Sequence, residues 1–82
     1  MSKISQTDML KVLSEAFDAP LAELRLDTER DSIPGWDSMG ALTLMAEMDE
    51  RFSLQLSPDR SRKMSKIADI FTYLRENEAL LD

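Results

Sequence analysis

The sequence of 82 residues contains no cysteine and no histidine. Without cysteine the chain has no disulfide, no thiolate metal site and no cysteine nucleophile. Without histidine it also lacks the usual general base near neutral pH and the commonest protein ligand for metals. We therefore expect a protein that is not an enzyme and that binds no metal.

Long apolar runs are also missing. No stretch approaches the 18 apolar residues of a membrane-spanning helix, and residues 1–6 lack the apolar segment of a signal peptide. The hydrophobic fraction of 43% is nevertheless too high for a disordered chain. These features predict one globular domain, residues 1–82, that is cytoplasmic and does not bind membranes.

Basic residues are outnumbered by acidic ones, 10 to 16, which gives a net charge of −6. Nucleic acid needs lysine and arginine for its phosphates, so we expect no nucleic-acid binding and favour a basic protein partner. The charge is uneven along the chain. Residues 23–50 sum to −6, whereas residues 51–66 sum to +4.

Apolar residues recur at helical spacing in three places. The spacing predicts helices over residues 7–17, from Asp37-Ser38 to about residue 52, and from just after Ser65, its expected N-cap, into a frayed end at residues 76–78. Pro58 opens a short polar segment, residues 59–63, in which we expect one helical turn. The fold class is therefore all-α, a small bundle of three main helices plus one short helix.

The remaining segment, residues 18–36, is a long connection between the first two helices. Such loops are uncommon in compact domains and are often functional. We expect its apolar residues to hold it against the core: Leu21, Leu24, Leu26 and Ile33. We also expect Trp36 to cover one end of the bundle.

The second helix has two apolar stripes where a globular helix needs one. The wider stripe, the expected core face, holds Ala41, Leu44, Met45, Met48 and Phe52. The narrower stripe lies well away from it and is flanked by two acidic residues. It comprises Met39, Leu42 and Ala46, beside Asp49 and Glu50.

The sequence contains neither a calcium-binding EF-hand loop nor a glycine-rich phosphate-binding loop. In an EF-hand loop starting at Asp27, positions 6 and 12 would be Ser32 and Ser38 instead of glycine and glutamate. The only glycines, Gly35 and Gly40, are not followed by the residues of a phosphate-binding loop.

One constellation remains, in which a serine opens the second helix directly after a turn and an acid. It reads Gly35-Trp36-Asp37-Ser38-Met39-Gly40. A phosphate attached to Ser38 would lie beside unpaired backbone N–H groups and the positive end of the helix dipole. The simpler interpretation is that Ser38 or Asp37 only caps the helix.

From this point to residue 74 the sequence resembles the acyl carrier protein family without a gap. The family pattern has Asp-Ser-Leu at the start of its second helix, an acidic–acidic–x–Phe ending, an apolar-x-apolar pair and a Ser- or Thr-led last helix. The matching residues are Asp37-Ser38-Met39, Leu42, Leu44-Met45, Met48, Asp49-Glu50, Phe52, Leu54, Leu56, Ser65-Lys66-Ile67 and Ile70.

The resemblance implies a monomeric carrier bundle with 4′-phosphopantetheine on Ser38, positioned with the help of Asp37. The carrier would tether an acyl group as a thioester, in a pathway such as fatty-acid or polyketide biosynthesis. Its partners would be a phosphopantetheinyl transferase and the enzymes that load and use the cargo. The resemblance assigns docking to Met39, Leu42, Ala46, Asp49 and Glu50. Met45 and Met48 are either core residues, the favoured interpretation, or shelter for an acyl chain.

Several residues depart from fatty-acid carriers. Gly40 and Thr43 stand where Asp and Glu are common, and the usually acidic third helix is basic through Arg60, Arg62 and Lys63. A basic patch repels basic docking surfaces, so we expect a stand-alone carrier for a specialised pathway. Two alternatives stay open. One is an aminoacyl or peptidyl carrier, and the other is a helical interaction module without a prosthetic group.

Overall fold

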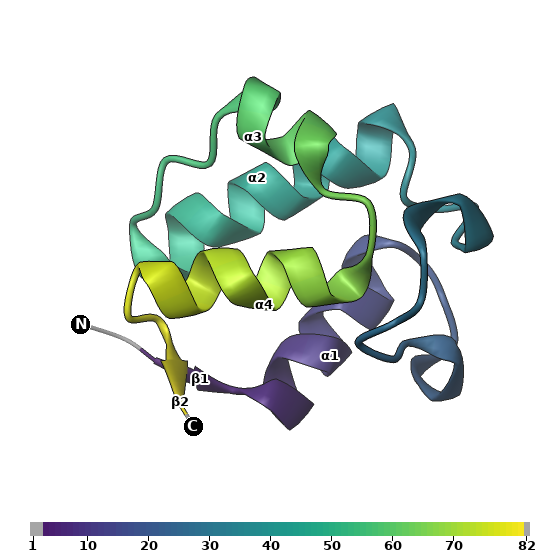
Figure 1. Ribbon diagram of the computed structural model, residues 1–82, viewed down its shortest axis with the longest axis horizontal. Coiled ribbons are helices and arrows are strands. Elements are labelled where there is room, and N and C mark those ends of the chain that lie inside the picture. Colours follow the sequence, from purple (N-terminus) through teal and green to yellow (C-terminus); the bar gives the residue numbers. More distant parts are fainter. Residues whose placement is uncertain (1–2, 82) are drawn as a thin grey trace.

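The computed structural model describes residues 3–81, so both tips of the predicted domain 1–82 lie outside the described residues. Its helices are α1 (Gln6–Ala16), α2 (Ser38–Phe52), α3 (Pro58–Lys63) and α4 (Ile67–Glu76), with two 3₁₀ turns, η1 (Leu21–Glu23) and η2 (Arg30–Ser32). The strands β1 (Ile4–Ser5) and β2 (Leu80–Leu81) complete the chain. The predicted fold class, three main helices and one short one, is confirmed (Figure 1).

Three of the four helices begin with the same local device. The side-chain oxygen of the N-cap residue accepts a hydrogen bond from the backbone N–H three residues later. Ser5 accepts from Asp8 at 3.1 Å, Asp37 from Gly40 at 3.0 Å, and Ser57 from Arg60 at 3.1 Å. Because these contacts are local, the helix starts follow closely from the sequence.

Helix α4 begins differently, and the prediction of Ser65 as its N-cap is wrong. The cap residue is Lys66. A carboxylate oxygen of Asp69 accepts hydrogen bonds from the backbone N–H groups of Ser65 at 2.8 Å and Lys66 at 3.3 Å. The hydroxyl of Ser65 also donates to this oxygen, at 3.1 Å, so the acid reaches back from the first turn to hold the entry of the helix.

The core lies where α1, α2 and α4 meet. Its fully buried side chains are Met9 and Leu13 from α1, Leu44 and Met48 from α2, and Ile67, Ile70 and Leu74 from α4. On the predicted core face of α2, Ala41, Leu44 and Met48 are buried, whereas Met45 and Phe52 are half-buried.

The connection between α1 and α2 is held partly by side chains and partly by its backbone. Leu24 and Ile33 are buried as expected, but Leu21 and Leu26 are 43% and 40% exposed, so their assignment to the core was wrong. Instead, backbone carbonyls of the connection bind the start of α4. The carbonyl of Leu26 accepts from the N–H of Ala68 at 2.8 Å, and that of Thr28 accepts from Ile67 at 3.0 Å.

The end of the chain is ordered where fraying was expected. Helix α4 stops at Glu76, and Glu78 adopts a positive φ of 56° that turns the chain back. Ala79 and Leu80 are then buried, and β2 pairs in parallel with β1, with Ile4 opposite Leu80. The strands β1 and β2, from the first and last parts of the described chain, therefore lie side by side (Figure 1).

Candidate functional site

Ser38 is the first residue of α2, and its side chain is exposed. Asp37 performs the capping, through its carboxylate and through its carbonyl, which accepts from the N–H of Ala41 at 2.8 Å. The Ser38 hydroxyl makes no hydrogen bond to any residue in the range 3–81. The serine at the start of α2 is therefore left available while its neighbour caps the helix.

The turn before Ser38 is fixed by close packing against the end of α1. As predicted, Trp36 is buried at 3% exposure, and its ring stacks on Phe17 with centroids 4.9 Å apart. A Cβ atom at Gly35 would lie 1.7 Å from the carbonyl oxygen of Phe17, and one at Gly40 would lie 2.0 Å from the carbonyl oxygen of Gly35. Only glycine permits both approaches, so they set the position from which α2 starts.

A pocket of about 300 Å³ opens beside Ser38, between the connection, α2 and α3. Its lining consists of Arg30, Ser38, Ala41, Leu42, Met45, Pro58, Ser61 and Arg62. Met45 and Met48, both considered above as core or as shelter for an acyl chain, differ in the structure. Met48 is a core residue with no exposure, whereas the half-buried Met45 lines this pocket.

Arg30 belongs to this site although sequence reasoning did not select it. Its Nε donates to the carbonyl of Trp36 at 3.3 Å, and its Nη1 donates to the carbonyls of Ser61 at 3.2 Å and Met64 at 3.5 Å. Its guanidinium carbon lies 5.2 Å from the centre of the Trp36 ring. One side chain thus joins the connection, the turn before α2 and helix α3. The only signal in the sequence was a basic residue within an acidic segment.

The second apolar stripe of α2 faces solvent. Met39 is 71% exposed and Leu42 is 58% exposed, and Ala46, Asp49 and Glu50 are also exposed. One oxygen of Asp49 accepts a hydrogen bond from Gln55 at 2.9 Å, so this carboxylate is held in place. The five residues therefore form a mixed apolar and acidic face that extends along α2 from the Ser38 end.

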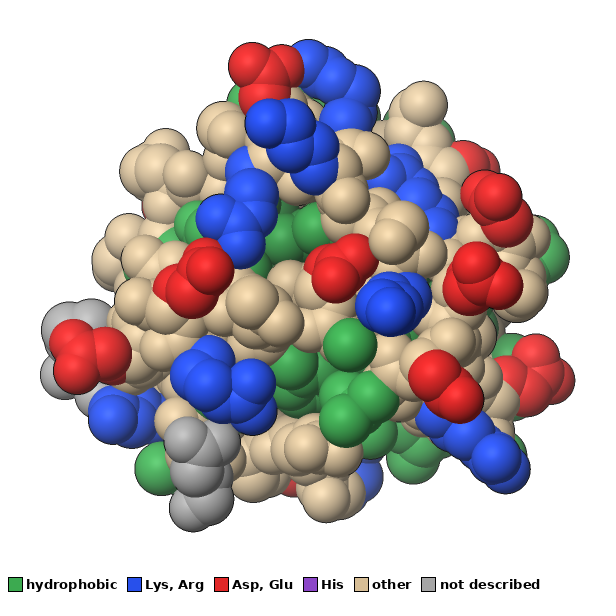
Figure 2. Space-filling model, viewed as in Figure 1, with side chains coloured by type: hydrophobic (Ala, Val, Ile, Leu, Met, Phe, Trp, Pro, Cys, Tyr) green, Lys and Arg blue, Asp and Glu red, His purple; other side chains and the backbone are tan. Residues whose placement is uncertain are grey.

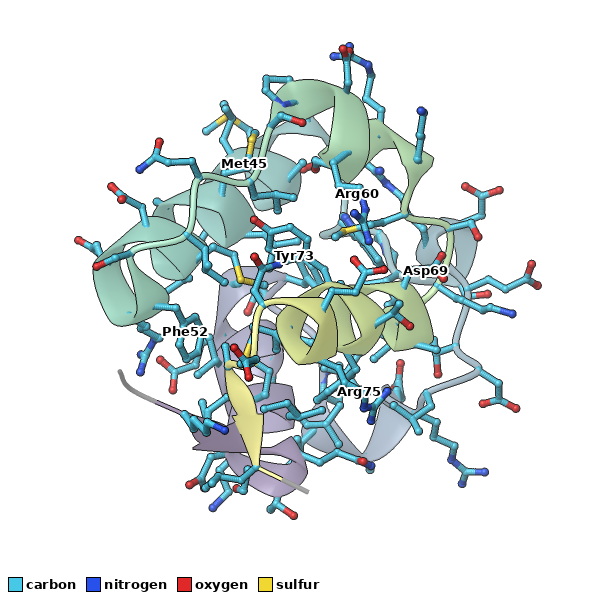
Figure 3. All side chains as sticks on the ribbon, turned by 60° about the vertical axis from the view of Figure 1, so that its left-hand side comes forward. Met45, Phe52, Arg60, Asp69, Tyr73 and Arg75 are labelled. Atoms are coloured by element: carbon cyan, nitrogen blue, oxygen red, sulfur yellow. The ribbon has the colours of Figure 1, made fainter. Side chains whose placement is uncertain are left out.

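The basic residues of α3 adjoin that face at one point, because Arg62 and Leu42 line the same pocket. Figure 2 shows lysine and arginine side chains gathered over α3 at the top of the molecule. Arg60 turns toward α4, where it pairs with Glu76 at 2.7 Å and lies 5.2 Å from the ring centre of Tyr73 (Figure 3). Burial raises the pKa of Tyr73, and the charge of Arg60 opposes that rise.

Two other kinds of site find no support within residues 3–81. No group of three or more histidine, cysteine, aspartate or glutamate side chains is placed to bind a metal ion. In the same part of the chain, no helix has the length and apolar character needed to cross a bilayer.

The chain is similar over most of its length to proteins named acyl carrier protein. The protein of that name from Rickettsia bellii (strain RML369-C) is 24% identical over 81 residues, which cover 96% of this chain and 94% of the relative. That from Helicobacter acinonychis (strain Sheeba) is 22% identical over 71 residues, covering 87% of this chain and 91% of the relative. No family model matches the chain.

These comparisons confirm the resemblance of this chain to the acyl carrier protein family. The relatives align with both halves of the chain, including the first helix, so the likeness extends beyond residues 35–74. Within this family pattern, Gly40 has a structural explanation. The position where the carrier pattern often has Asp is here too close to the backbone of Gly35 for any side chain.

Proposed function

We propose that this chain is a carrier protein that tethers an acyl intermediate as a thioester on 4′-phosphopantetheine attached to Ser38. The observation that carries the proposal is the exposed hydroxyl of Ser38 at the first turn of α2, free of hydrogen bonds to residues 3–81. The similarity of the chain to proteins named acyl carrier protein supports the same chemistry.

The residues around Ser38 fit a phosphodiester. The start of a helix stabilises a negative charge through its unpaired N–H groups and its dipole. Asp37 already bonds the N–H of Gly40, which keeps the first turn in shape without using the serine. Arg30 and Arg62 line the adjoining pocket and add positive charge. When bound, the arm supplies the thiol that carries the cargo, and the chain has no cysteine of its own to compete for it.

In this proposal the chain carries out no chemical step itself. It holds Ser38 where a transferase can reach it, and it presents the attached arm to enzymes that dock nearby. Tethering replaces free diffusion by a high effective concentration at each docked enzyme. The packing of Trp36 and the two glycines against α1 keeps that presentation rigid.

We assign docking to the exposed face of α2, formed by Met39, Leu42, Ala46, Asp49 and Glu50. Apolar side chains beside carboxylates suit a partner that offers a small apolar site rimmed by arginine or lysine. The partners are a phosphopantetheinyl transferase and the enzymes that load and use the cargo. The basic α3 and the absence of acids at Gly40 and Thr43 favour partners of a specialised pathway over those of ordinary fatty-acid synthesis.

The attachment site is tested by incubating the purified protein with coenzyme A and each of several phosphopantetheinyl transferases. The intact mass should rise by one phosphopantetheine, and Ser38→Ala should abolish the gain. Ser32→Ala removes another exposed hydroxyl and should be modified like the wild type. A wild type that no transferase modifies, or modification that persists in Ser38→Ala, would refute attachment and favour the helical interaction module.

The docking face is tested by the rate of the same reaction. Leu42→Asp puts a charge on the exposed apolar stripe and should slow modification at least about tenfold, the effect of roughly 1.4 kcal/mol at an interface. Leu21→Asp is the control, because Leu21 is 43% exposed on another part of the surface. Equal rates for the two variants, at unchanged thermal stability, would remove Leu42 from the docking face.

A further inference from the structure

The pocket beside Ser38 has an unusual charge for this molecule. The chain carries 16 acidic residues against 10 basic ones, yet the pocket lining includes two arginines and no carboxylate. Ala41, Leu42, Met45 and Pro58 make the remainder mostly apolar. Apolar walls lower the local dielectric, so a charge placed between them interacts more strongly than it would at the open surface.

Arg30 brings to this pocket a positive charge that has no carboxylate partner among the described residues. The side chain is half-buried, and its three hydrogen bonds all go to backbone carbonyls. Within residues 3–81 it forms no ion pair, and its Nη2 makes no hydrogen bond. A guanidinium has five N–H donors in a planar fork that matches the oxygens of a carboxylate or phosphate. Donors on Nη2 therefore remain for an anion.

Ser61 provides a second, independent sign of a missing partner. The residue is 2% exposed, lines the same pocket, and its hydroxyl oxygen has no hydrogen-bond partner among the described residues. Buried polar side chains are nearly always hydrogen-bonded, so the unpaired hydroxyl of Ser61 leaves an unused polar group in the wall of this pocket.

Arg62 adds a second charge at the same pocket. It pairs with Asp59, but its side chain is 68% exposed, so the pairing is weak and easily exchanged. Asp59 does not line the pocket. An anion placed there would meet two guanidinium groups and no repelling carboxylate from the lining.

We propose that this pocket binds an oxyanion on the group attached to Ser38, with Arg30 as the principal contact; this specificity rests on the proposed function. The oxyanion is either the phosphodiester of the arm or a carboxylate at the far end of the cargo. An alkyl chain buried there would remove water from the charged Arg30 without pairing it, which is unfavourable. An aminoacyl cargo that ends in an ammonium group would be repelled. If the cargo supplies the oxyanion, the pocket therefore favours an acidic acyl group over both.

The cargo is tested without any transferase. Ser38→Cys gives the chain one cysteine, which forms mixed disulfides by thiol exchange with the symmetrical disulfide of butanethiol, 4-mercaptobutanoate or 3-aminopropanethiol, releasing one free thiol. These adducts differ only in a methyl, carboxylate or ammonium end. At low salt the carboxylate adduct should melt higher than the methyl adduct by roughly 4–8 °C, the shift expected for one charge-assisted contact in a domain of this size. The ammonium adduct should melt lowest.

The phosphodiester is tested by comparing the unmodified protein with the form carrying the arm and no cargo. If the phosphodiester is the anion, the arm should raise the melting temperature and should move the ³¹P resonance, and both effects should shrink in Arg30→Gln. If the cargo carboxylate is the anion, Arg30→Gln should reduce only the differences in melting temperature between the disulfide adducts.

Arg30→Gln is compared with Arg60→Gln, a change on α3 outside this pocket that should leave the differences between adducts intact. Each variant is measured against its own untethered form, because Arg30 also holds the fold. If Arg30→Gln does not fold, the exposed Arg62→Gln replaces it as the test variant. The difference in melting temperature between the carboxylate and methyl adducts should then shrink by a smaller amount. A methyl adduct as stable as the carboxylate adduct, together with an arm whose effect is independent of Arg30, would overturn the inference. That result would leave the proposed attachment to Ser38 intact, because the transferase reaction tests it separately. If no transferase modifies Ser38, the disulfide series still tests whether the pocket binds an anion.

Discussion

At Gly40 the first turn of α2 touches the backbone of the connection. An added Cβ would lie 2.0 Å from the carbonyl oxygen of Gly35 and 3.1 Å from Cδ1 of Phe17. A carbonyl cannot move aside as the end of a flexible side chain can. The absence of an acidic side chain at this position is therefore a packing requirement of this bundle, and it brings the turn of Ser38 close to α1.

Gly40→Ala should lower the free energy of unfolding by about 1–3 kcal/mol, the usual cost of overpacking. Alanine is the better helix former by about 1 kcal/mol, so a loss would show that the contact outweighs helix propensity. Urea denaturation measures the difference. Thr43→Ala, at an exposed position of the same helix, should change stability by less than about 0.5 kcal/mol. A more stable Gly40→Ala would contradict the close packing.

Asp37 and Ser38 divide two tasks that a single residue could have combined. The carboxylate of Asp37 accepts the capping hydrogen bond, and the hydroxyl of Ser38 stays exposed. At this scale a difference of one residue decides whether an oxygen serves the fold or is available for chemistry.

Among the elements, the start of α4 is the point where helix and connection are joined. Its first N–H groups donate to carbonyls of Leu26 and Thr28, and Asp69 binds the backbone of Ser65 and Lys66. The pKa of Asp69 lies below its ordinary value of 3.8, chiefly because the N–H of Ser65 donates to the charged carboxylate. Only the ionised form receives the full benefit of these bonds.

A lowered pKa in the folded state means that Asp69 stabilises the protein above its unfolded pKa, and that this contribution is lost as pH falls through the folded value. Asp69→Asn should therefore lower the free energy of unfolding by about 1–2 kcal/mol at pH 7. The difference from wild type should disappear in acid. Thermal melts between neutral pH and strongly acidic pH measure it, with the exposed Asp59→Asn as the control. A deficit that does not change with pH would contradict this role for the carboxylate.

Helix α3 depends on its neighbours because a helix of six residues is too short to be stable alone. Arg30 holds it from the connection through the carbonyls of Ser61 and Met64. Its own Arg60 holds it to α4, through Glu76 and the ring of Tyr73 (Figure 3). The element that closes the Ser38 pocket is thus fixed by arginines on two sides.

Across the whole molecule, the parallel pairing of β1 and β2 joins the two ends of the chain. Ile4 donates its N–H to the carbonyl of Ala79 at 2.9 Å, and Leu80 is buried against the core at 6% exposure. The contact spans nearly the whole sequence, so it restrains α1 and α4 at once.

Leu80→Ala should cost about 2 kcal/mol of unfolding free energy, at the lower end for truncating a buried leucine, because the site lies at the edge of the core. Leu81→Ala is the matched control, since Leu81 is 53% exposed and contributes far less burial. Chemical denaturation distinguishes them. Equal stability of the two variants would mean that the terminal pair adds nothing to the bundle.

The sequence by itself determined the helices, the capping at the start of α2 and the two stripes of that helix. These features depend on residues three or four positions apart, as when Asp37 meets Gly40 or when Leu42 follows Met39. The exposed position of Ser38 follows from the same local rule. The resemblance to carriers was recognisable for this reason, since its pattern is one of spacing along helices.

Only the tertiary structure decided three features: the position of Arg30, the burial of particular leucines in the connection, and the pairing of β1 with β2. Arg30 donates to the carbonyl of Ser61, 31 positions further along the chain, and no local sequence pattern predicts such a contact. Leu24 is buried and Leu26 is exposed although they lie two positions apart in the same connection, and only the packed structure distinguishes them. Contacts between distant residues form only when helices pack, so their chemistry cannot be read from spacing.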